Sequence, residues 1–528
     1  MITEPTGSGA SAECPHAIVI GSGFGGLAAA VRLGARGYRV TVLEKLDAPG
    51  GRGYVYRQDG FTFDAGPTII TAPFLLEELW TLCGKDFASD IDLRPIDPYY
   101  RIRFHDGSTF DYNGNTEHMH REIAKFNPDD VAGYDKFLSI SQRVYAVGFD
   151  QLLSTSFESL WKMIRVLPSL AFVQFYRSVY GLVSRCITHP KLRQVFSFHP
   201  LLIGGNPFTT TGVYTLIAHL ERRHGVHFAM GGTGRVIEGI VSLIEGQGNA
   251  IRYHAPVSQI LVNNRRAVGV ELESGEQLAA DIVVSNADAA YTYRHLVSAP
   301  YRKRWSNRKL KRARYSMSLF VWYFGTNKQY PDVPHHMIML GERYKGLLSN
   351  IFDAKVLSDD FSLYLHRPTM TDPSLAPGGC DTFYVLAPVP HLESGTDWNT
   401  EAEKYRRSIE QFLCATVLPG LADHVVTSRM LTPLDFKHRL NSMHGAAFSL
   451  QPTLLQTGWF RPHNRAEDIE HLYLVGAGTH PGAGIPGVVS SARVLDEVVP
   501  DPQALLPESD DSMEGMEYWG QLGLERNK

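Results

Sequence analysis

The chain has 528 residues, of which 44% are hydrophobic and 20% are charged, and its formal net charge is −4. This length is too great for one ordinary hydrophobic core, so at least two domains are expected. The nearly balanced charge excludes the strongly basic surface typical of nucleic-acid-binding proteins, and it favours a small or apolar partner.

The cellular compartment is indicated by what the sequence lacks. Five widely spaced cysteines favour a reducing, cytoplasmic location, and residues 1–16 have no apolar core of a secretory signal. No stretch reaches the roughly 18 apolar residues of a membrane-spanning helix. The segment 160–183 mixes apolar runs with basic residues, which suits either a helix at a membrane surface or a core helix of a substrate domain.

The first ordered segment predicts a nucleotide-binding unit. The apolar run 17-AIVIG-21 reads as a strand, 27-LAAAVRLGARG-37 as a helix and 38-YRVTVLE-44 as a second strand. Gly21, Gly23 and Gly26 lie at the turn in the spacing G-x-G-x-x-G, where a pyrophosphate can approach the backbone. Glu44, at the end of the second strand, is placed to accept hydrogen bonds from a ribose.

A second loop, 48-APGGRGY-54, follows this unit. It resembles the G-G-R segment of flavoproteins of the glutathione-reductase and amine-oxidase types, in which an arginine neutralises pyrophosphate charge. Arg52 is therefore a candidate cofactor ligand, with a surface arginine as the alternative. We add the flanking Ser22, Lys45 and Gly51, and Val257 further along the chain, to the predicted cofactor contacts.

The rest of the chain predicts mostly helices, then short strands, then a return to the nucleotide-binding pattern. Residues 94–215 read as mainly helical, with a charged helix near 116–146, and three short runs between 257 and 286 predict a β-meander. Strand-like runs occur at 316–325 and 382–388. The strand 472-LYLVG-476 leads into glycines and a helix near Pro486, which predicts flavin contacts at Gly478, Thr479, Pro486, Gly487 and Val488.

Together these segments predict an α/β fold with a discontinuous Rossmann-type FAD-binding domain of the glutathione-reductase and amine-oxidase type. Its parts are 15–95, 215–295 and 430–500. The insertions 96–214 and 296–429 are expected to form a substrate-binding, membrane-associated domain, and 1–14 and 501–528 to be flexible tails.

Absent motifs narrow the expected chemistry. No second G-x-G-x-x-G follows a strand, so electrons are expected to leave the flavin for oxygen or a quinone rather than come from NADPH. No cysteine follows Cys414, so no thioether to a flavin is expected near the C-terminal glycines. The histidines show no metal-ligand spacing with acidic neighbours, so no metal site is expected, although His480 follows those glycines closely enough to contact a flavin ring.

Several longer strings resemble the bacterial and fungal phytoene desaturases. The resemblance covers residues 15–495 and is carried by VIGSGFGGLAAAVRL near the N-terminus, 60-GFTFDAGPTIIT-71, 196-FSFHPLLIGGNPF-208 and 474-LVGAGTHPGAGIPGV-488. It implies a flavoprotein with non-covalent FAD as its sole redox cofactor. The substrate would be phytoene, a C40 polyene converted stepwise to neurosporene or lycopene in carotenoid biosynthesis. The protein would lie peripherally on the inner membrane.

The resemblance also suggests a catalytic residue and leaves alternatives open. Arg165 occupies a position where family members can carry an arginine proposed to assist catalysis, but Lys162 replaces the aspartate that accompanies it in some relatives. Aromatic and apolar residues could line a substrate tunnel or belong to the core: Phe172, Phe175, Tyr176, Phe320, Val321, Trp322 and Phe324. Alternative functions are desaturation or isomerisation of a later carotenoid and, without catalysis, the escort of a prenyl lipid.

Overall fold

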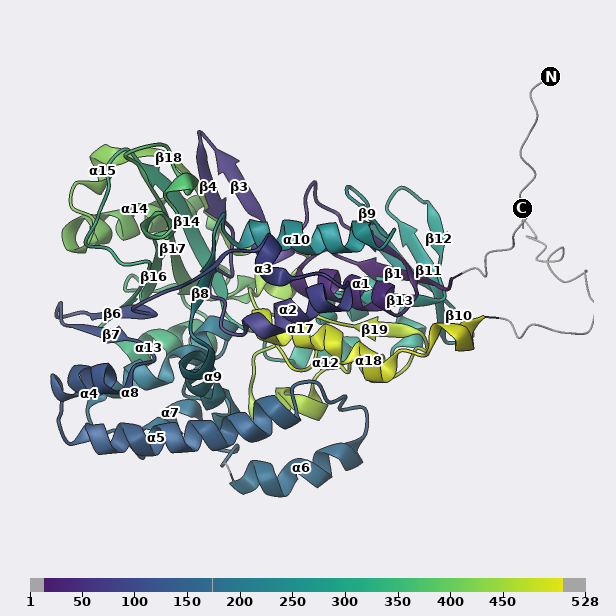
Figure 1. The fold of residues 1–528 in the computed structure, drawn as a ribbon, viewed down its shortest axis with the longest axis horizontal. Coiled ribbons are helices and arrows are strands. Elements are labelled where there is room, and N and C mark those ends of the chain that lie inside the picture. The colour runs from purple at the N-terminus through teal and green to yellow at the C-terminus, as the bar shows by residue number, and fades with distance from the viewer. Residues whose placement is uncertain (1–13, 173, 507–528) are drawn as a thin grey trace, which may run out of the picture.

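A five-stranded parallel sheet holds the N-terminal glycine motif. The computed structural model describes residues 14–172 and 174–506 (Figure 1). The sheet takes its strands from the beginning, middle and end of the chain. In spatial order they are β19 (Leu472–Leu474), β13 (Ile282–Ser285), β1 (His16–Ile20), β2 (Arg39–Leu43) and β9 (Ala250–Arg252).

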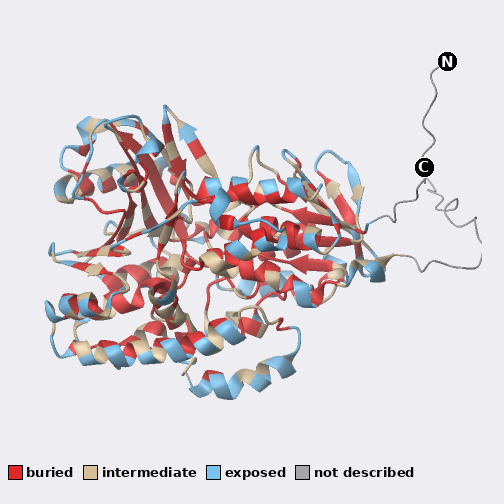
Figure 2. Cartoon of the chain, in the orientation of Figure 1, coloured by how far each residue is buried: buried red, intermediate tan, exposed pale blue. Residues whose placement is uncertain are grey.

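Both faces of this sheet are covered, which explains why its central strands are continuously apolar. Four helices lie on one face: α1 (Phe24–Ala35), α2 (Pro73–Leu82), α10 (Thr233–Gly246) and α17 (Ile485–Arg493). An antiparallel sheet packs on the other: β10 (Val257–Asn263), β11 (Arg266–Leu272) and β12 (Gln277–Ala279). Figure 2 shows the resulting buried layer in red.

One expected element lies elsewhere in the fold. The run 281-DIVVSN-286 was predicted as the last strand of the meander, but its core forms β13, which pairs in parallel with β1 and β19. All four residues of β13 are buried, so the strand suits a sheet covered on both faces rather than a half-exposed meander. The meander is completed instead by β12.

The second large sheet has seven strands and is mostly antiparallel. The runs predicted as strands near 320 and 385 are confirmed as its neighbouring strands β14 and β17. In spatial order the sheet contains β18 (Val425–Leu431), β14 (Ser318–Thr326), β17 (Asp381–Val389), β16 (Leu363–His366), β15 (His336–Leu340), β6 (Tyr100–Phe104) and β7 (Thr109–Tyr112).

Helices cover both faces of this sheet as well. The long helix α14 (Trp398–Thr416) packs on one face. The charged helix expected near 116–146 is two helices, interrupted next to Pro128, whose missing N–H disfavours a continuous helix. These and other helices cover the opposite face: α4 (Thr116–Ala124), α5 (Asp130–Tyr145), α7 (Val179–Val183), α8 (Pro190–Ser197), α9 (Leu216–His224) and α13 (Tyr344–Ser349).

Shorter elements complete the described chain. The helix α6 (Leu160–Phe172) lies at the lower edge of Figure 1, beneath the end of α5. No helix among the described residues is long and apolar enough to cross a bilayer. Residues 501–506 of the expected C-terminal tail contain a short 3₁₀ turn, Pro502–Leu505, whereas 1–13 and 507–528 lie outside the described residues.

The remaining elements connect these layers. They are β3 (Val55–Gln58), β4 (Phe61–Asp64), β5 (Leu93–Pro95), β8 (His227–Ala229), α3 (Phe87–Asp90), α11 (Ala289–Tyr291), α12 (Asn307–Arg312), α15 (Leu421–His424), α16 (Pro433–His438) and α18 (Leu495–Val498).

Candidate functional site

A large cavity is bordered by residues of both sheets and has a volume of about 480 Å³. At one end it is lined by the glycine motif, the end of β2 and the start of α17. At the other it is lined by apolar side chains from α6, α9 and the seven-stranded sheet. Ten predicted site residues line it: Gly21, Gly23, Glu44, Lys45, Gly51, Arg52, Val257, Pro486, Gly487 and Val488.

Two helix N-termini meet this cavity. The helix α1 begins after Gly23 and α17 begins after Gly484, and neither N-terminus has a capping side chain or an acidic residue in its first turn. Their backbone N–H groups are therefore available, and the positive ends of both helix dipoles favour an anion. This arrangement fits the phosphates of a dinucleotide.

The glycines of the motif are required by close approach. A Cβ atom at Gly26 would lie 2.0 Å from the carbonyl oxygen of Gly21, so a larger residue cannot keep α1 packed against its strand. At Gly23 a Cβ would lie 3.0 Å from the Asn286 amide nitrogen. The first position, Gly21, has a φ of +89°, which favours glycine.

Glu44 is fixed at the end of β2 but retains capacity for a ligand. Its Oε2 accepts hydrogen bonds from the backbone N–H of Ser22, at 2.9 Å, and from the Ser22 hydroxyl, at 2.7 Å, while its Oε1 accepts one from the N–H of Leu46, at 2.8 Å. A carboxylate offers about four lone-pair positions, so one remains for a ribose hydroxyl. The side chain is therefore both buried and pre-oriented.

Arg52 and Lys45 tie the cofactor end of the cavity to the C-terminal part of the chain. Arg52 Nε donates to the carbonyl of Ala447 at 2.6 Å and Nη2 to the Ser442 hydroxyl at 2.9 Å. Lys45 Nζ donates to the carbonyl of His438 at 2.7 Å. Both side chains therefore line the cavity as anchored positive charges, suited to a phosphate or ribityl oxygen.

A buried acceptor without a partner faces the same region. Asp288 caps α11 through Oδ1, which accepts from the backbone N–H groups of Ala290 and Tyr291, and its Oδ2 has no partner among the described residues. Asp288 also lines the cavity. Buried polar atoms are almost always hydrogen-bonded, so this oxygen fits a donor on a bound ligand.

Five predicted residues lie outside the cavity lining. Ser22 and Gly26 act indirectly, through Glu44 and through helix packing. Gly478 and Thr479 lie behind the wall, and the Thr479 hydroxyl donates to the carbonyl of Pro462 at 2.6 Å. Arg165 is exposed on α6. The structure therefore brings the cofactor residues together and leaves Arg165 apart from them.

The candidate tunnel residues divide between the core, the surface and the cavity. Phe320, Val321, Trp322 and Phe324 are core residues of the seven-stranded sheet, whereas Phe172 and Tyr176 are exposed. Only Phe175 of this set lines the cavity within the described residues. Most of the apolar wall was not predicted, because it comes from scattered positions: Phe149, Leu152, Leu153, Phe157, Met163, Leu170, Leu201, Leu216, Leu220, Leu319 and Leu386.

His480 lies at the cavity wall, where its sequence position suggested a flavin contact. Its Nε2 lies 2.8 Å from the carbonyl oxygen of Leu152, its Nδ1 has no partner among the described residues, and burial lowers its pKa to about 4. The ring is therefore neutral at neutral pH, with the N–H assigned to Nε2 by the carbonyl it faces.

A buried polar group occupies the wall far along the chain from the glycine motif. Glu221 on α9 lines the cavity, and its carboxylate accepts a hydrogen bond from the Tyr100 hydroxyl at 2.7 Å and lies 3.1 Å from Nε2 of His199. All three side chains are buried. No motif includes Glu221, but an acidic residue on the inner face of an amphipathic helix could have marked it as a candidate site residue.

Comparisons with known proteins bear on this site. The family model described as flavin containing amine oxidoreductase matches residues 24–494. The chain is 49% identical over 496 residues to a neurosporene-forming phytoene desaturase from Cereibacter sphaeroides, covering 93% of this chain and 96% of that protein. It is also 49% identical over 477 residues to a lycopene-forming phytoene desaturase from Pantoea ananas, covering 90% and 97%.

Among solved structures, the fold is similar to that of cyclohexylamine oxidase from Brevibacterium oxydans. The TM-score is 0.58 at 15% identity, and the alignment covers 93% of this chain and 99% of that one. At this identity the likeness supports the fold alone.

Proposed function

This chain belongs to the family of flavin containing amine oxidoreductases, and we propose that it desaturates phytoene, in successive steps, to neurosporene or lycopene. It is an FAD-dependent oxidoreductase. One observation carries the substrate assignment: the chain is nearly half identical, over nine tenths of its length, to desaturases of this polyene. The apolar wall of the cavity suits such a substrate.

The residues present fit FAD. The N-termini of α1 and α17 and the Arg52 guanidinium would hold the phosphates and the oxygens beside them, and Glu44 would hold the adenosine ribose. Bound FAD supplies a two-electron acceptor for the hydride that leaves a C–H bond of the substrate. The apolar wall holds the polyene in place and keeps water away from the reacting carbons.

The second hydrogen leaves as a proton, and the chain offers a carboxylate for it. Of the acidic residues that line the cavity, Glu44, Glu273 and Asp288 lie at the cofactor end, whereas Glu221 lies on α9 beside apolar Leu220. We assign proton acceptance to the Glu221 carboxylate, which Tyr100 and His199 orient. For Arg165 to assist catalysis, α6 would have to move in the substrate complex and bring this side chain into the cavity.

A membrane surface is the proposed source of the substrate. On α6 the side chains of Trp161 and Phe172 are 66% and 71% exposed, and the basic Lys162 and Arg165 are exposed beside them. The opposite side of the same helix contributes Met163 and Leu170 to the cavity wall. A helix with apolar side chains toward both the cavity and the outside suits a segment that lies at a membrane surface. A polyene dissolved in the lipid would enter the cavity beside this helix without crossing water.

The experiment that tests the function uses purified full-length protein with FAD and phytoene in liposomes, under air or with a quinone as electron acceptor. We expect longer polyenes in the chromatogram, ending at neurosporene or lycopene. Gly23→Val is expected to abolish them by blocking the cofactor, and Gly378→Val, at an exposed glycine with open space around it, to leave them unchanged.

Two other outcomes would redirect the assignment. If FAD binds but phytoene is untouched, a later carotenoid becomes the substrate to test. If the protein does not bind FAD and does not convert any carotenoid, the proposed function fails and the escort of a prenyl lipid becomes the hypothesis to test.

A further inference from the structure

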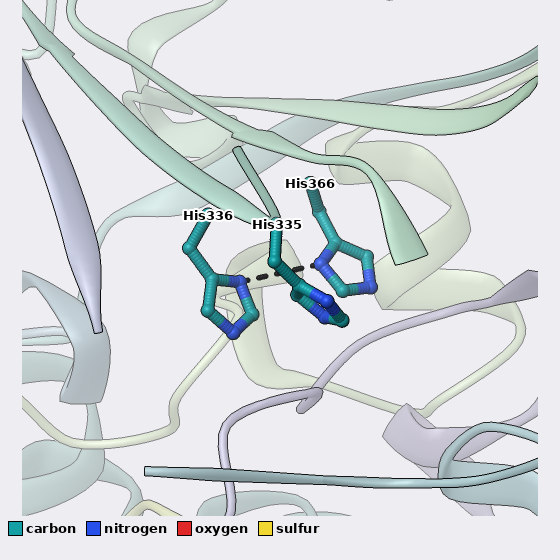
Figure 3. A group of neighbouring side chains, drawn as sticks. All are labelled: His335, His336 and His366. Atoms are coloured by element: carbon teal, nitrogen blue, oxygen red, sulfur yellow. Dashed lines mark hydrogen bonds between the residues drawn. The ribbon is translucent and has the colours of Figure 1, made fainter. Parts of the chain in front are cut away.

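Three buried histidines converge between two strands of the seven-stranded sheet (Figure 3). His336 begins β15 and faces His366, which ends β16, across the antiparallel pair, and His335 precedes them. One nitrogen from each ring lies within 4.8 Å of the other two. The Nδ1 atoms of His336 and His366 are 3.3 Å apart. The trio therefore gathers three potential metal ligands from two segments of the chain.

All three histidine rings are buried. An imidazole ring binds a metal through the lone pair of one of its nitrogens.

Some ring nitrogens of the three histidines have a hydrogen-bond partner and others have none. Nδ1 of His335 pairs with the Thr371 hydroxyl and Nδ1 of His336 with the Tyr364 hydroxyl, each at 2.6 Å. Nε2 of all three rings has no partner among the described residues. The nitrogens of His336 and His366 that face each other are the Nδ1 atoms, whereas their Nε2 atoms point apart (Figure 3).

The ligand atoms of the cluster, all imidazole nitrogens, favour a divalent transition metal ion. Imidazole nitrogens suit Zn²⁺, Cu²⁺, Fe²⁺ and Ni²⁺, whereas Mg²⁺ and Ca²⁺ prefer the oxygen ligands that this cluster largely lacks. Tetrahedral Zn²⁺ with bonds of roughly 2.0–2.1 Å separates its ligand nitrogens by about 3.4 Å. The 3.3 Å between the Nδ1 atoms of His336 and His366 matches that separation.

We propose that His335, His336 and His366 form a three-histidine site for a divalent transition metal ion, with Zn²⁺ as the best fit. His335 supplies the third nitrogen, and a water molecule or the Tyr364 hydroxyl takes the fourth position. The neighbouring Arg367 does not oppose the ion with a free charge, because Asp381 pairs with it through two hydrogen bonds of 2.8 and 3.2 Å.

The position of the site assigns it a structural role. Tyr364 lies on β16, lines the cavity and contacts both His336 and Thr68, another cavity residue. An ion between β15 and β16 would therefore link two strands and fix the wall that Tyr364 forms. This proposal does not depend on the identity of the substrate.

The test measures metal in the untagged holoenzyme. The protein is equilibrated with excess ZnCl₂, passed through a desalting column and analysed for zinc and FAD by plasma mass spectrometry and absorbance. We expect about one Zn²⁺ per chain in the wild type and in His105→Gln, which alters an exposed histidine. His366→Gln and His336→Asn are expected to lower the ratio at least tenfold.

A wild-type ratio that stays below one tenth after equilibration overturns the proposal, and the trio is then an aromatic cluster with buried water. An equal zinc ratio in wild type and in both variants overturns it too, because the ion then lies elsewhere. If the variants do not fold, Co²⁺ replaces Zn²⁺ in the wild type. Visible ligand-field bands of a tetrahedral nitrogen site support the proposal, and the spectrum of aqueous Co²⁺ contradicts it.

Discussion

The two large sheets differ in how their functional groups are made. At the parallel sheet the proposed ligand-binding groups are mainly backbone N–H groups at two helix N-termini, where glycines leave room for a cofactor. At the seven-stranded sheet they are side chains from distant segments, such as Glu221 with Tyr100 and His336 with His366. Backbone sites tolerate no added Cβ, whereas side-chain sites depend on single functional groups.

The largest expected effect is at the parallel sheet. Gly26→Ala would place a Cβ 2.0 Å from the Gly21 carbonyl oxygen, which backbone atoms cannot relieve by rotation. We expect a loss of about 3 kcal/mol in stability, at the upper end of overpacking costs, together with loss of bound FAD. Thermal unfolding and the FAD absorbance after gel filtration measure both. Gly378→Ala, at an exposed glycine, is the matched control, and equal behaviour of the two variants would contradict the close-packing argument.

The second prediction concerns Glu221, which lines the cavity away from its cofactor end. Glu221→Gln keeps the size and most hydrogen bonds of the side chain but removes its capacity to take a proton. We expect kcat for desaturation to fall by about 100-fold with unchanged FAD content. Glu238→Gln, exposed on α10, serves as the control. A variant with normal kcat but lowered stability would show that Glu221 only holds α9 in place.

The third prediction concerns acid stability and His480. Burial lowers the pKa of this ring from 6.5 to about 4, so between these pH values the unfolded chain binds a proton that the folded chain does not. The contribution of His480 to stability is therefore complete above pH 6.5 and is lost as the pH falls toward 4. Relative to pH 7, we expect wild type to lose about 2 kcal/mol more than His480→Gln at pH 5. Urea unfolding at both pH values measures the difference, and equal losses would exclude the ring as a source of acid sensitivity.

The fourth prediction concerns the exposed side of α6. Trp161→Glu replaces a 66% exposed apolar ring by a charge and should weaken sedimentation with liposomes about tenfold. Val356→Glu makes the same kind of change at a 53% exposed side chain in a loop outside α6. If both variants sediment equally, α6 is not the contact with lipid.

The smallest effect is expected for Arg165→Ala. The side chain is exposed on α6, and an interfacial arginine is worth about 1 kcal/mol of attraction to an anionic surface. Assays with liposomes and with detergent-dispersed substrate separate its two possible roles. A weaker binding to anionic liposomes with normal kcat supports an interfacial role, whereas a lower kcat in both media supports the predicted catalytic one.

The same contrast explains what could be predicted from the sequence. Strand, glycine turn and helix are adjacent along the chain at 17–44 and again at 472–493, so local patterns were sufficient to predict these strands and most of the proposed cofactor residues that line the cavity. Lys45 and Val257 were predicted and do line the cavity. Gly478 and Thr479 were predicted to contact the cofactor but do not line the cavity. The sequence pattern locates the turn but does not show which of its atoms face the cavity.

The apolar wall and the histidine trio could not be predicted in this way. Phe320, Trp322 and Phe324 alternate with other apolar residues in one strand, and only the second layer of α14 decides that they are core. His366 meets His336 through strand register, which depends on pairing across about 30 residues of intervening chain. Spacing along the sequence carries no information about such a pair.

The assembly of the parallel sheet has a consequence for biosynthesis. Its outer strand β19 and the helix α17 are translated long after β1 and α1, although all four elements border the same cavity. At roughly 5–20 residues per second, ribosomes need on the order of a minute between these two segments. A cofactor can therefore bind to both helix N-termini only after α17 has been translated.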